Sequence, residues 1–387
     1  MSMLKSFQIL DLLLSWKRNL FKRKGPGRGI LIISAGGLGD TVLFSLVVSR
    51  FATLALEKEP VTILLRNDSA KMAFLFPKEF FIEIVNFINF RKSVLYRHKI
   101  ANCLFKAHYR LVISTDQLRH PDLDEAMIRM AEPDQAFAME PRSWPKYDVQ
   151  LKANRRLYGR LFDSGPDRID KVVRWSNFAN WLTRKDLPPP KVRIDSSIFT
   201  EKEGLQTSDV YIQPFSAVAL KQSPVGLYRK IISALPDGTS VAIIGTPGDL
   251  NDNPQFRELL ELAGVTFNSA PFEELIINLK AAKLMISVDT AAMHLAAAIG
   301  TPTLCLASAA FVGEIVPYAP EVMPDNLCVI YKSMTCEGCL GYCHLEPVED
   351  MYPCVAALDD DQAVLKALEL FEFKVTPSDK ASCSLLH

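Results

Sequence analysis

The sequence predicts an α/β protein with two doubly wound domains. Short β-rich runs alternate with helical patterns along both halves of the chain, an order typical of parallel sheets covered by helices on both faces. At 387 residues, the chain is also too long for one ordinary core. The alternation stops at Lys185–Pro190, because three consecutive prolines cannot continue a helix, and then resumes. We therefore expect an N-terminal segment at 1–28, domains at 29–185 and 209–387, and a proline-rich linker at 186–208.

In the N-terminal half, short apolar runs are predicted strands and longer periodic runs are predicted helices. The strands are Ile30–Ile33, Val61–Leu65, Ile82–Val85 and Leu111–Ser114, and the helices are Thr41–Lys58, Arg91–Phe105 and Gln150–Phe162. The stretch Arg119–Tyr147 is polar and carries Trp144 between two prolines. Because the stretch is polar, we expect an irregular insertion there, and loops of this length often carry a substrate.

The C-terminal half repeats the alternation of predicted strands and helices. The strands are Val210–Gln213, Val241–Ile244, Val265–Phe267, Leu284–Val288 and Thr303–Leu306, and the helices are Tyr228–Leu235, Gln255–Ala263, Glu273–Ala282 and Met293–Ile299. No short period recurs along the chain, which excludes a solenoid.

Residues 1–28 combine positive charge with apolar residues at near-helical spacing, and Asp11 is their single acidic residue. The basic residues are Lys5, Lys17, Arg18, Lys22, Arg23, Lys24 and Arg28, and the apolar ones are Leu4, Phe7, Leu10, Leu14 and Trp16. The pattern predicts a basic amphipathic helix that lies on an anionic membrane surface. The alternatives are a helix docked on the body of the protein and a helix that frays.

The apolar run in this segment is too short to span a bilayer, which takes about 20 residues. Charges within Trp16–Lys24 and the lack of a small-residue cleavage site argue against a secretory signal. We therefore expect a cytoplasmic protein, peripheral on the inner face of the cytoplasmic membrane. Lys+Arg and Asp+Glu both number 44, so no global basic field indicates nucleic acid as a partner.

Two junctions between a predicted strand and a predicted helix carry residues suited to an anion. The first is the glycine loop of Gly36, Gly37 and Gly39, which leads to Asp40, and the second is Asp289–His294. A helix start offers free N–H groups and a partial positive charge, and glycines let a ligand approach the backbone. The alternatives are structural: Asp40 and Asp289 as helix caps, and His294 as a buried histidine with satisfied hydrogen bonds.

Two further loops follow predicted strands of the C-terminal half. Lys221 stands in the loop after Val210–Gln213, where an ammonium group is well placed to neutralise phosphate. The alternative for Lys221 is a solvated surface lysine. In the loop Gly245–Asp249, Asp249 is a candidate acceptor for ribose hydroxyls, and the alternative is turn chemistry, since Pro-Gly-Asp favours a turn.

Together these segments resemble the heptosyltransferase family, glycosyltransferase family 9. The resemblance rests on Ile32–Thr41, Pro214–Lys221, Ser287–Ala298 and Gly300–Pro302, which occur in family order and at family-like spacing. It extends over most of the chain, from about residue 28 to residue 370. The Asp-Thr-x-x-x-His pattern within the third stretch is the most specific part of it.

The resemblance implies the GT-B fold, in which two Rossmann-like domains face each other across a cleft and the C-terminal one holds a nucleotide-sugar. It implies that Asp40 is catalytic and that Lys221 binds the diphosphate of the donor. The donor-binding set that it implies is Ser216, Lys221, Gly245, Asp249, Asp289, Thr290, Ala291 and His294. Within this set, Ser216 is expected at phosphate and Asp249 at ribose. Ala291 departs from the family pattern, which usually has glycine, and its methyl group is expected to crowd backbone near the donor phosphates.

The resemblance also implies an inverting sugar transfer. Asp40 would take the proton of the acceptor hydroxyl while Lys221 and the helix start near Thr290 stabilise the leaving nucleoside diphosphate, with no metal or cofactor required for catalysis. We expect a donor like ADP-heptose and a cell-surface glycan or glycolipid acceptor of the lipopolysaccharide type. One alternative, favoured by Ala291, is a catalytically silent member that binds a glycan or a partner protein.

Another alternative is a Rossmann-type oxidoreductase. Such an enzyme would place an acidic residue after its second strand, to bind the ribose hydroxyls of a dinucleotide. Here Arg66 and Asn67 follow Val61–Leu65, and the spacing of the glycines is also wrong for a dinucleotide. Both observations argue against this alternative.

Four cysteines fall within a short C-terminal loop at 336–354, and they are Cys336, Cys339, Cys343 and Cys354. The Cys-x2-Cys start suits a tetrahedral site for zinc or iron. We therefore expect a structural metal in this loop, and the alternatives are reduced thiols packed in a loop or two disulfides.

Overall fold

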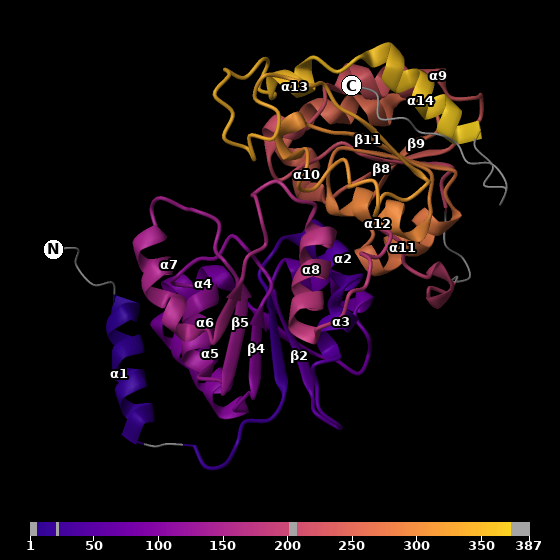
Figure 1. The fold of residues 1–387 in the computed structure, drawn as a ribbon. Helices are drawn as coiled ribbons and strands as arrows, with labels where there is room; N and C mark the ends of the chain where they lie inside the picture. The colour runs from indigo at the N-terminus through magenta and orange to yellow at the C-terminus, as the bar shows by residue number, and fades with distance from the viewer. Residues whose placement is uncertain (1–5, 21–22, 201–206, 373–387) are drawn as a thin grey trace. The chain divides into compact units, whose positions relative to one another are not determined.

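The computed structural model describes residues 6–20, 23–200 and 207–372 (Figure 1). They form two compact units, the first made of residues up to 167 with 174–188 and the second of 168–173 with the residues from 189 onward. Each unit contains one six-stranded sheet in which every pair of neighbouring strands is parallel. The predicted α/β class with two Rossmann-like domains is therefore confirmed.

The sheet of the first unit has the strand order β3-β2-β1-β4-β5-β6. The strands are β1 Ile30–Ser34, β2 Val61–Arg66, β3 Phe81–Val85, β4 Leu111–Ser114, β5 Gln135–Met139 and β6 Arg160–Phe162. Ile30 of β1 stands opposite Val61 of β2 and Leu111 of β4. All five residues of β1 are buried, which explains its continuous apolar run in the sequence.

Helices cover both faces of this sheet (Figure 1). One face carries α4 Phe87–Lys92, α5 Val94–Ala107 and α6 Asp124–Ala131, with α1 Ser6–Leu20 outside them, and the other carries α2 Leu38–Ser45, α3 Val48–Ala52 and α8 Lys171–Thr183. The second layer is held by aromatic contacts: the ring of Phe44 lies 5.3 Å from that of Trp175, and the ring of Phe51 lies 5.6 Å from that of Phe178. The short helices α7 Asp148–Asn154, η1 Ser69–Leu75 and η2 Arg155–Leu157 complete the unit.

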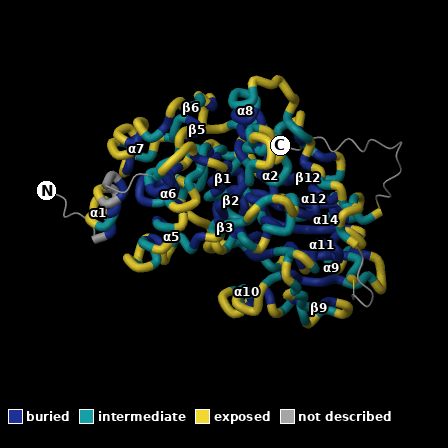
Figure 2. The backbone as a smooth tube through the Cα atoms, turned by 90° about the horizontal axis from the view of Figure 1, so that it is seen from below, coloured by how far each residue is buried: buried dark blue, intermediate teal, exposed yellow. Residues whose placement is uncertain are grey.

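The second unit repeats this architecture, with the strand order β12-β11-β10-β7-β8-β9. The strands are β7 Val210–Gln213, β8 Val241–Ile244, β9 Val265–Asn268, β10 Leu284–Ser287, β11 Thr303–Leu306 and β12 Leu327–Ile330. One face carries α9 Val225–Ala234 and α14 Asp360–Glu372, and the other carries α11 Phe272–Ala281 and α12 Ala291–Ile299 (Figure 1). Shorter helices are α10 Pro247–Asp252, α13 Pro353–Ala356, η3 Ser196–Ile198, η4 Ala219–Lys221, η5 Pro254–Glu261 and η6 Ala309–Phe311. In both units the sheets lie in the buried interior (Figure 2).

The predicted helix Thr41–Lys58 is wrong in its extent. The structure has two short helices, α2 and α3, and α2 begins inside the glycine loop. The break follows Ser45, whose hydroxyl donates to the carbonyl of Val42 at 2.7 Å. The next two N–H groups bond three residues back rather than four, so the helix tightens and ends.

The predicted irregular insertion Arg119–Tyr147 is also wrong, because it contains α6 and β5. Several of its polar residues are buried, namely Arg119, His120, Asp122, Asp124 and Glu125. Arg119 and Glu125 are fully buried and form an ion pair at 3.2 Å, and the carboxylate of Glu125 also accepts from Asn154 at 2.7 Å. A helix or strand with a buried ion pair has charged residues at core positions. Its sequence therefore lacks the apolar pattern by which a helix or strand is predicted.

The predicted helix Gln150–Phe162 ends early, at Asn154 of α7, and the residues after it form η2 and the strand β6. The amide of Gly159 donates to Ala136 at 3.0 Å, which starts the pairing of β6 with β5. The predicted helix Gln255–Ala263 is the 3₁₀ helix η5. The structure adds α8, β12, α13 and α14, which the sequence did not predict.

The predicted N-terminal helix is present as α1, and it is docked on the first unit. Phe7 and Leu14 are buried, and Arg97 of α5 forms an ion pair with Asp11 at 2.6 Å. Arg18 donates to two backbone carbonyls of the unit at 3.0 and 3.1 Å. Leu4, Lys5 and Lys22 lie outside the described residues, as does the side chain of Lys17. Within the described part of the chain, no helix combines the length and apolar character needed to cross a bilayer.

A buried carboxylate joins the loops that precede β1 and β2. Glu59 accepts hydrogen bonds from the guanidinium of Arg110 at 2.6 and 2.8 Å and from the amides of Gly29 and Leu56 at 2.8 and 2.9 Å. These bonds, that of Arg110 first, lower the pKa of Glu59 to about 2. The ionised carboxylate therefore stabilises the folded state.

We expect Glu59→Gln to destabilise the first unit by about 3 kcal/mol at pH 7. Because the folded pKa lies below the unfolded one, the stabilisation by wild-type Glu59 is present above about pH 4.5 and is lost as the pH falls towards 2. Urea unfolding of both proteins at pH 7 and pH 3 measures this, and the difference should shrink by more than half at pH 3. A difference that stays constant with pH would contradict the assignment.

Candidate functional site

Each sheet has a point where the chain connections leave in opposite directions, between β1 and β4 in the first unit and between β7 and β10 in the second. In open parallel sheets, ligands bind at the carboxyl ends of the strands beside this point. The predicted site residues follow these strands: Gly36–Asp40 follows β1, Lys221 follows β7 and Asp289–His294 follows β10. The loop Gly245–Asp249 follows β8, the neighbour of β7.

The glycine loop of the first unit closes around the carboxylate of Asp40. The N-cap of α2 is Gly37, and Asp40, the third residue of the helix, accepts from its amide at 3.0 Å. Asp40 thus caps the helix from inside its first turn rather than from the N-cap position that we considered. A Cβ atom on Gly36 would lie 2.6 Å from the Cβ of Asp40, so only glycine fits there. Gly39 lies within the first turn of α2.

Residues after β4 that the sequence analysis did not select lie beside this loop. The carboxylate of Asp116 accepts from the amide of Ala35 at 2.7 Å, and the carbonyl of Gln117 accepts from the amide of Arg142 at 3.0 Å. Asp116 could have been selected by its position, because it is the second residue after β4, the strand that neighbours β1. The polar stretch that we expected to be an insertion therefore begins at the same sheet edge as Asp40.

An aromatic cluster of His120, Trp144 and Tyr147 continues from this edge. The ring of Tyr147 lies 4.5 Å from that of His120 and 4.7 Å from that of Trp144. The Nδ1 of His120 accepts from the amide of Asp122 at 3.0 Å, which leaves Nε2 to donate to the hydroxyl of Tyr147 at 3.0 Å. Asp124 accepts from the amide of His120 at 2.7 Å, and burial raises the pKa of its carboxyl to about 7.

In the second unit, the loops after β7 and β10 meet in a buried ion pair. The Nζ of Lys221 lies 2.5 Å from a carboxylate oxygen of Asp289 and 4.6 Å from the ring centre of Phe311. The two charged side chains are 11% and 2% exposed. Burial raises the pKa of Asp289, and the neighbouring ammonium opposes that shift. The alternative of a solvated surface lysine at 221 is therefore wrong.

Helix α12 begins beside this pair. Its N-cap is Thr290 rather than Asp289, and the hydroxyl of Thr290 lies 3.0 Å from that of Ser287 instead of capping the helix. The first N–H groups of the helix therefore lack a side-chain cap and can bind an anion. His294 is buried, with its Nδ1 bonded to the hydroxyl of Tyr318, as the alternative of a satisfied histidine predicts. Ala291 is the first residue of α12 and is also buried.

Ser216, Gly245 and Asp249 have structural partners in the second unit. Ser216 accepts from the amide of Val218 at 3.2 Å. Asp249 accepts from the amide and hydroxyl of Thr246 at 2.6 and 2.8 Å, so the turn chemistry that we considered for it is present. A Cβ atom on Gly245 would lie 2.7 Å from the ring of Phe215, so glycine is required there for packing.

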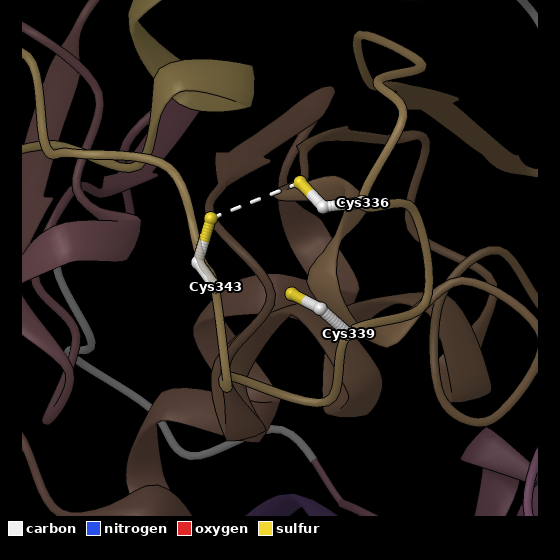
Figure 3. A group of neighbouring side chains, drawn as sticks. All are labelled: Cys336, Cys339 and Cys343. Carbon is white, nitrogen blue, oxygen red and sulfur yellow. Dashed lines mark hydrogen bonds between the residues drawn. The ribbon is translucent and has the colours of Figure 1, made fainter.

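Three of the four loop cysteines converge on one point. The sulfur atoms of Cys336, Cys339 and Cys343 all lie within 4.8 Å of one another (Figure 3), and those of Cys336 and Cys343 are 3.7 Å apart. A tetrahedral site with Zn–S bonds of about 2.3 Å places sulfurs about 3.8 Å apart, whereas a disulfide needs about 2.05 Å. The arrangement therefore fits a metal better than the disulfides that we considered.

Cys354 differs from the other three cysteines. It is buried outside that group, and its sulfur accepts from the amide of Ala309 at 3.3 Å.

Burial, then the hydrogen bond with Cys343, raises the pKa of Cys336 to about 11. In the absence of a cation, the Cys336 thiol is therefore protonated at neutral pH.

The cysteine loop is bonded to the loops that carry Lys221 and Phe311. The amide of Tyr352 donates to the carbonyl of Leu220 at 2.8 Å, directly before Lys221. The amides of Gly338 and Leu340 donate to the carbonyls of Ala309 and Ala310 in η6, at 2.9 and 2.7 Å. The cysteine loop therefore supports the backbone on which the ion pair depends.

Residues 166–337 match the model of glycosyltransferase family 9 (heptosyltransferase). No curated protein matches the chain.

Solved structures of this family are similar in fold. The glycosyl transferase family 9 protein from Veillonella parvula DSM 2008 is 15% identical with a TM-score of 0.65, and the alignment covers 89% of this chain and 97% of that one. E. coli heptosyltransferase WaaC with ADP-2-deoxy-2-fluoro heptose is 17% identical with a TM-score of 0.59, covering 88% and 98%. E. coli ADP-heptose lps heptosyltransferase II is 16% identical with a TM-score of 0.60, covering 89% and 98%. The likeness confirms a fold of the GT-B type.

We expect Lys221→Met to destabilise the second unit by about 3–5 kcal/mol, because it leaves the buried carboxylate of Asp289 without its cation. The double variant Lys221→Met/Asp289→Leu removes both charges and should recover most of that loss. Urea unfolding of the wild type and both variants measures the difference. Equal stability of the single variant and the wild type would contradict a mutual dependence of the two charges.

Proposed function

We propose that the chain, whose residues 166–337 match the model of glycosyltransferase family 9 (heptosyltransferase), transfers a heptose-like sugar from a nucleoside-diphosphate donor with inversion. The observation that carries the proposal is the pairing of Lys221 with Asp289 beside the uncapped start of α12. A buried ammonium and a helix start are two positive groups at one sheet edge. Such a pair suits a ligand with two phosphates.

Asp289 positions Lys221 in this proposal. Its carboxylate holds the ammonium group through one contact, and an ammonium has three N–H donors. The remaining donors bind the diphosphate oxygens and stabilise the charge that grows when the bond to the sugar breaks. Thr290, Ala291 and the uncapped N–H groups of α12 bind the same diphosphate. Ser216 contacts phosphate, Gly245 and Asp249 lie near the ribose, and His294 holds the α12 side of the donor site.

Asp40 is the base in this proposal. As an acceptor hydroxyl attacks C1 of the donor sugar, its proton passes to the Asp40 carboxylate, the new C–O bond forms, and the nucleoside diphosphate leaves with the electrons of the broken bond. The hydrogen bond from Gly37 supports the proposal, because it holds the carboxylate in one orientation. Lys221 and α12 provide the stabilisation of the leaving group in this scheme, so catalysis itself requires no metal.

We further propose ADP-heptose or a close analogue as the donor and a cell-surface glycan or glycolipid of the lipopolysaccharide type as the acceptor. The structure of E. coli WaaC was determined with an ADP-heptose analogue, and this supports the choice of donor. The expected location, peripheral on the inner face of the cytoplasmic membrane, belongs to the same proposal. It suits a soluble nucleotide donor and a lipid-linked acceptor.

Neither alternative function has comparable support. A silent member that binds a glycan or a partner protein would be favoured by the methyl group of Ala291, the first residue of α12, whereas the presence of Asp40 and Lys221 supports an active enzyme. An oxidoreductase would need an acidic side chain for ribose after β2. The nearest acid there is Asp68, which is paired with Arg66 at 2.6 Å.

We propose a structural zinc or iron ion bound by Cys336, Cys339 and Cys343, with Cys354 as a neighbouring thiol. The mutual distances of the three sulfurs support the proposal. A metal there would cross-link a loop that bonds to Leu220 and η6, so its effect on the reaction would be indirect.

We expect Asp40→Asn to lower the rate of transfer roughly 10²- to 10⁴-fold and to leave donor binding unchanged. The amide oxygen of asparagine can still accept from Gly37, so the loop keeps its hydrogen bond while the base is lost. Transfer from ADP-heptose to a lipopolysaccharide-type acceptor is measured by mass spectrometry, and donor binding is measured by calorimetry.

The control for this experiment is Lys221→Met/Asp289→Leu, which should fold and lose donor binding. A loss of donor affinity in Asp40→Asn equal to its loss of rate would refute Asp40 as the base. Absence of binding and transfer with every nucleotide-sugar in the wild type would refute the proposed function.

We expect protein purified without chelators to contain about one zinc or iron per chain by elemental analysis. Cys339→Ser should lose the metal and lower the melting temperature, because the cysteine loop is no longer cross-linked. Cys103→Ser, at an exposed cysteine of the first unit, is the matched control and should keep the metal. Wild-type protein that contains neither zinc nor iron, and whose melting temperature equals that of Cys339→Ser, would refute a structural metal in the cysteine loop.

A further inference from the structure

A buried tyrosine of the second unit is bonded to the imidazole of His294. The hydroxyl of Tyr318 forms a hydrogen bond with Nδ1 of His294, and the centres of the two rings lie 5.7 Å apart. Tyr318 is 2% exposed and His294 is 3% exposed, so both groups are shielded from bulk water. Among the residues that the structure describes, Nδ1 of His294 is the one hydrogen-bond partner of this hydroxyl.

The direction of this hydrogen bond follows from the burial of the phenol. Burial raises the pKa of Tyr318 well above its ordinary value, and the nearby carboxylate of Asp170 raises it further. The hydroxyl therefore keeps its proton at neutral pH, and a buried O–H group without an acceptor is costly. Tyr318 thus donates and Nδ1 accepts, so a neutral imidazole carries its own proton on Nε2.

The position of His294 makes this proton important for an anion. His294 is the fourth residue of α12, and a helical side chain points back over the turn before it. The imidazole therefore lies beside the first turn of α12, whose N–H groups have no side-chain cap. An Nε2–H group there adds a hydrogen-bond donor for an anion, whereas the other tautomer would present a lone pair that repels it.

The backbone next to Tyr318 is fixed by Asp170, which is buried and belongs to the same unit. One carboxylate oxygen of Asp170 accepts from the amide of Ala319 at 3.0 Å. The other accepts from the amides of Val172 and Val173 at 2.8 and 3.3 Å, at the start of α8. Asp170 therefore ties the residue after Tyr318 to a helix start, which holds the phenol in one place.

We propose that Tyr318 is a positioning residue of the donor site: it fixes the Nε2–H tautomer of His294, so that Nε2 donates to the donor diphosphate. The inference rests on the proposed function, because it assumes a diphosphate at the start of α12. Tyr318 acts through His294, and Asp170 acts through Tyr318. A neutral donor supplements the charge of Lys221 without a second buried cation, which would repel the ammonium group.

The tautomer is measured in the free protein by ¹⁵N NMR of labelled histidines at mildly alkaline pH, with His294→Gln assigning the His294 signals. In the wild type, Nδ1 should show the shift of an acceptor nitrogen and Nε2 that of a protonated one. Tyr318→Phe removes only the hydroxyl, and its spectrum should show a mixture of both tautomers. Wild-type Nε2 without a proton, or an unchanged spectrum in Tyr318→Phe, would overturn the proposal.

The effect on the donor site is measured by calorimetry with ADP as the probe. Tyr318→Phe should bind ADP roughly tenfold more weakly, the loss expected for one weakened hydrogen bond to an anion. An amide has no tautomers, so the same substitution should have no effect in the His294→Gln background. Equal losses in both backgrounds would show that Tyr318 does not act through His294, and the proposal would be wrong.

The matched control is Tyr211→Phe, at a fully buried tyrosine of the same unit whose hydroxyl accepts from the amide of Ser208 at 3.0 Å. This variant should keep the tautomer of His294 and the affinity for ADP. A similar loss of ADP binding in Tyr211→Phe would assign the effect to general destabilisation and overturn the proposal. A wild type that binds none of ADP, GDP and UDP would refute the proposed donor site itself. That outcome differs from normal wild-type binding that Tyr318→Phe leaves unchanged, which refutes the role of Tyr318 alone.

Discussion

The buried pair of Lys221 and Asp289 is the constraint on which the candidate donor site depends. An ammonium group that is 11% exposed needs a nearby carboxylate, and a carboxylate that is 2% exposed needs a cation, so neither residue can be placed there alone. Strand order satisfies this condition, because β7 and β10 are neighbours and both residues follow their carboxyl ends. Desolvation offsets much of the attraction in such pairs. The pair therefore fixes the position of the Lys221 ammonium group more than it adds to the free energy of unfolding.

The first unit uses the same strand order with a different chemical solution. Its central strands β1 and β4 end in Gly36–Asp40 and Asp116, and backbone amides rather than a buried ammonium orient both carboxylates. One architecture thus places a paired cation in the second unit and amide-bound carboxylates in the first. The paired cation of the second unit suits a phosphate ligand, and the amide-bound carboxylates of the first unit suit proton transfer.

How far the sequence could predict this structure depends on whether the determining contacts were local. β1 and β10 could be predicted from the sequence, because a strand buried on both faces is a continuous apolar run. By contrast, α6 and β5 were hidden, because Arg119 and Glu125 lie in the core and neutralise each other there. Lys221 and Asp289 were each selected from local position. Their contact was not predictable from either loop, because it joins residues 68 positions apart through the order of the strands.

The cysteine loop shows why a structural metal is a physically reasonable part of this fold. Residues 331–352 contain no helix or ladder strand, only turns and the isolated bridge between Val348 and Met351. A long irregular segment loses much conformational entropy on ordering, and hydrogen bonds to Leu220 and η6 compensate only part of that cost. One ion bound by three thiolates would restrict the loop at three points within eight residues. The metal would then stabilise the backbone before Lys221 without contacting the reacting atoms.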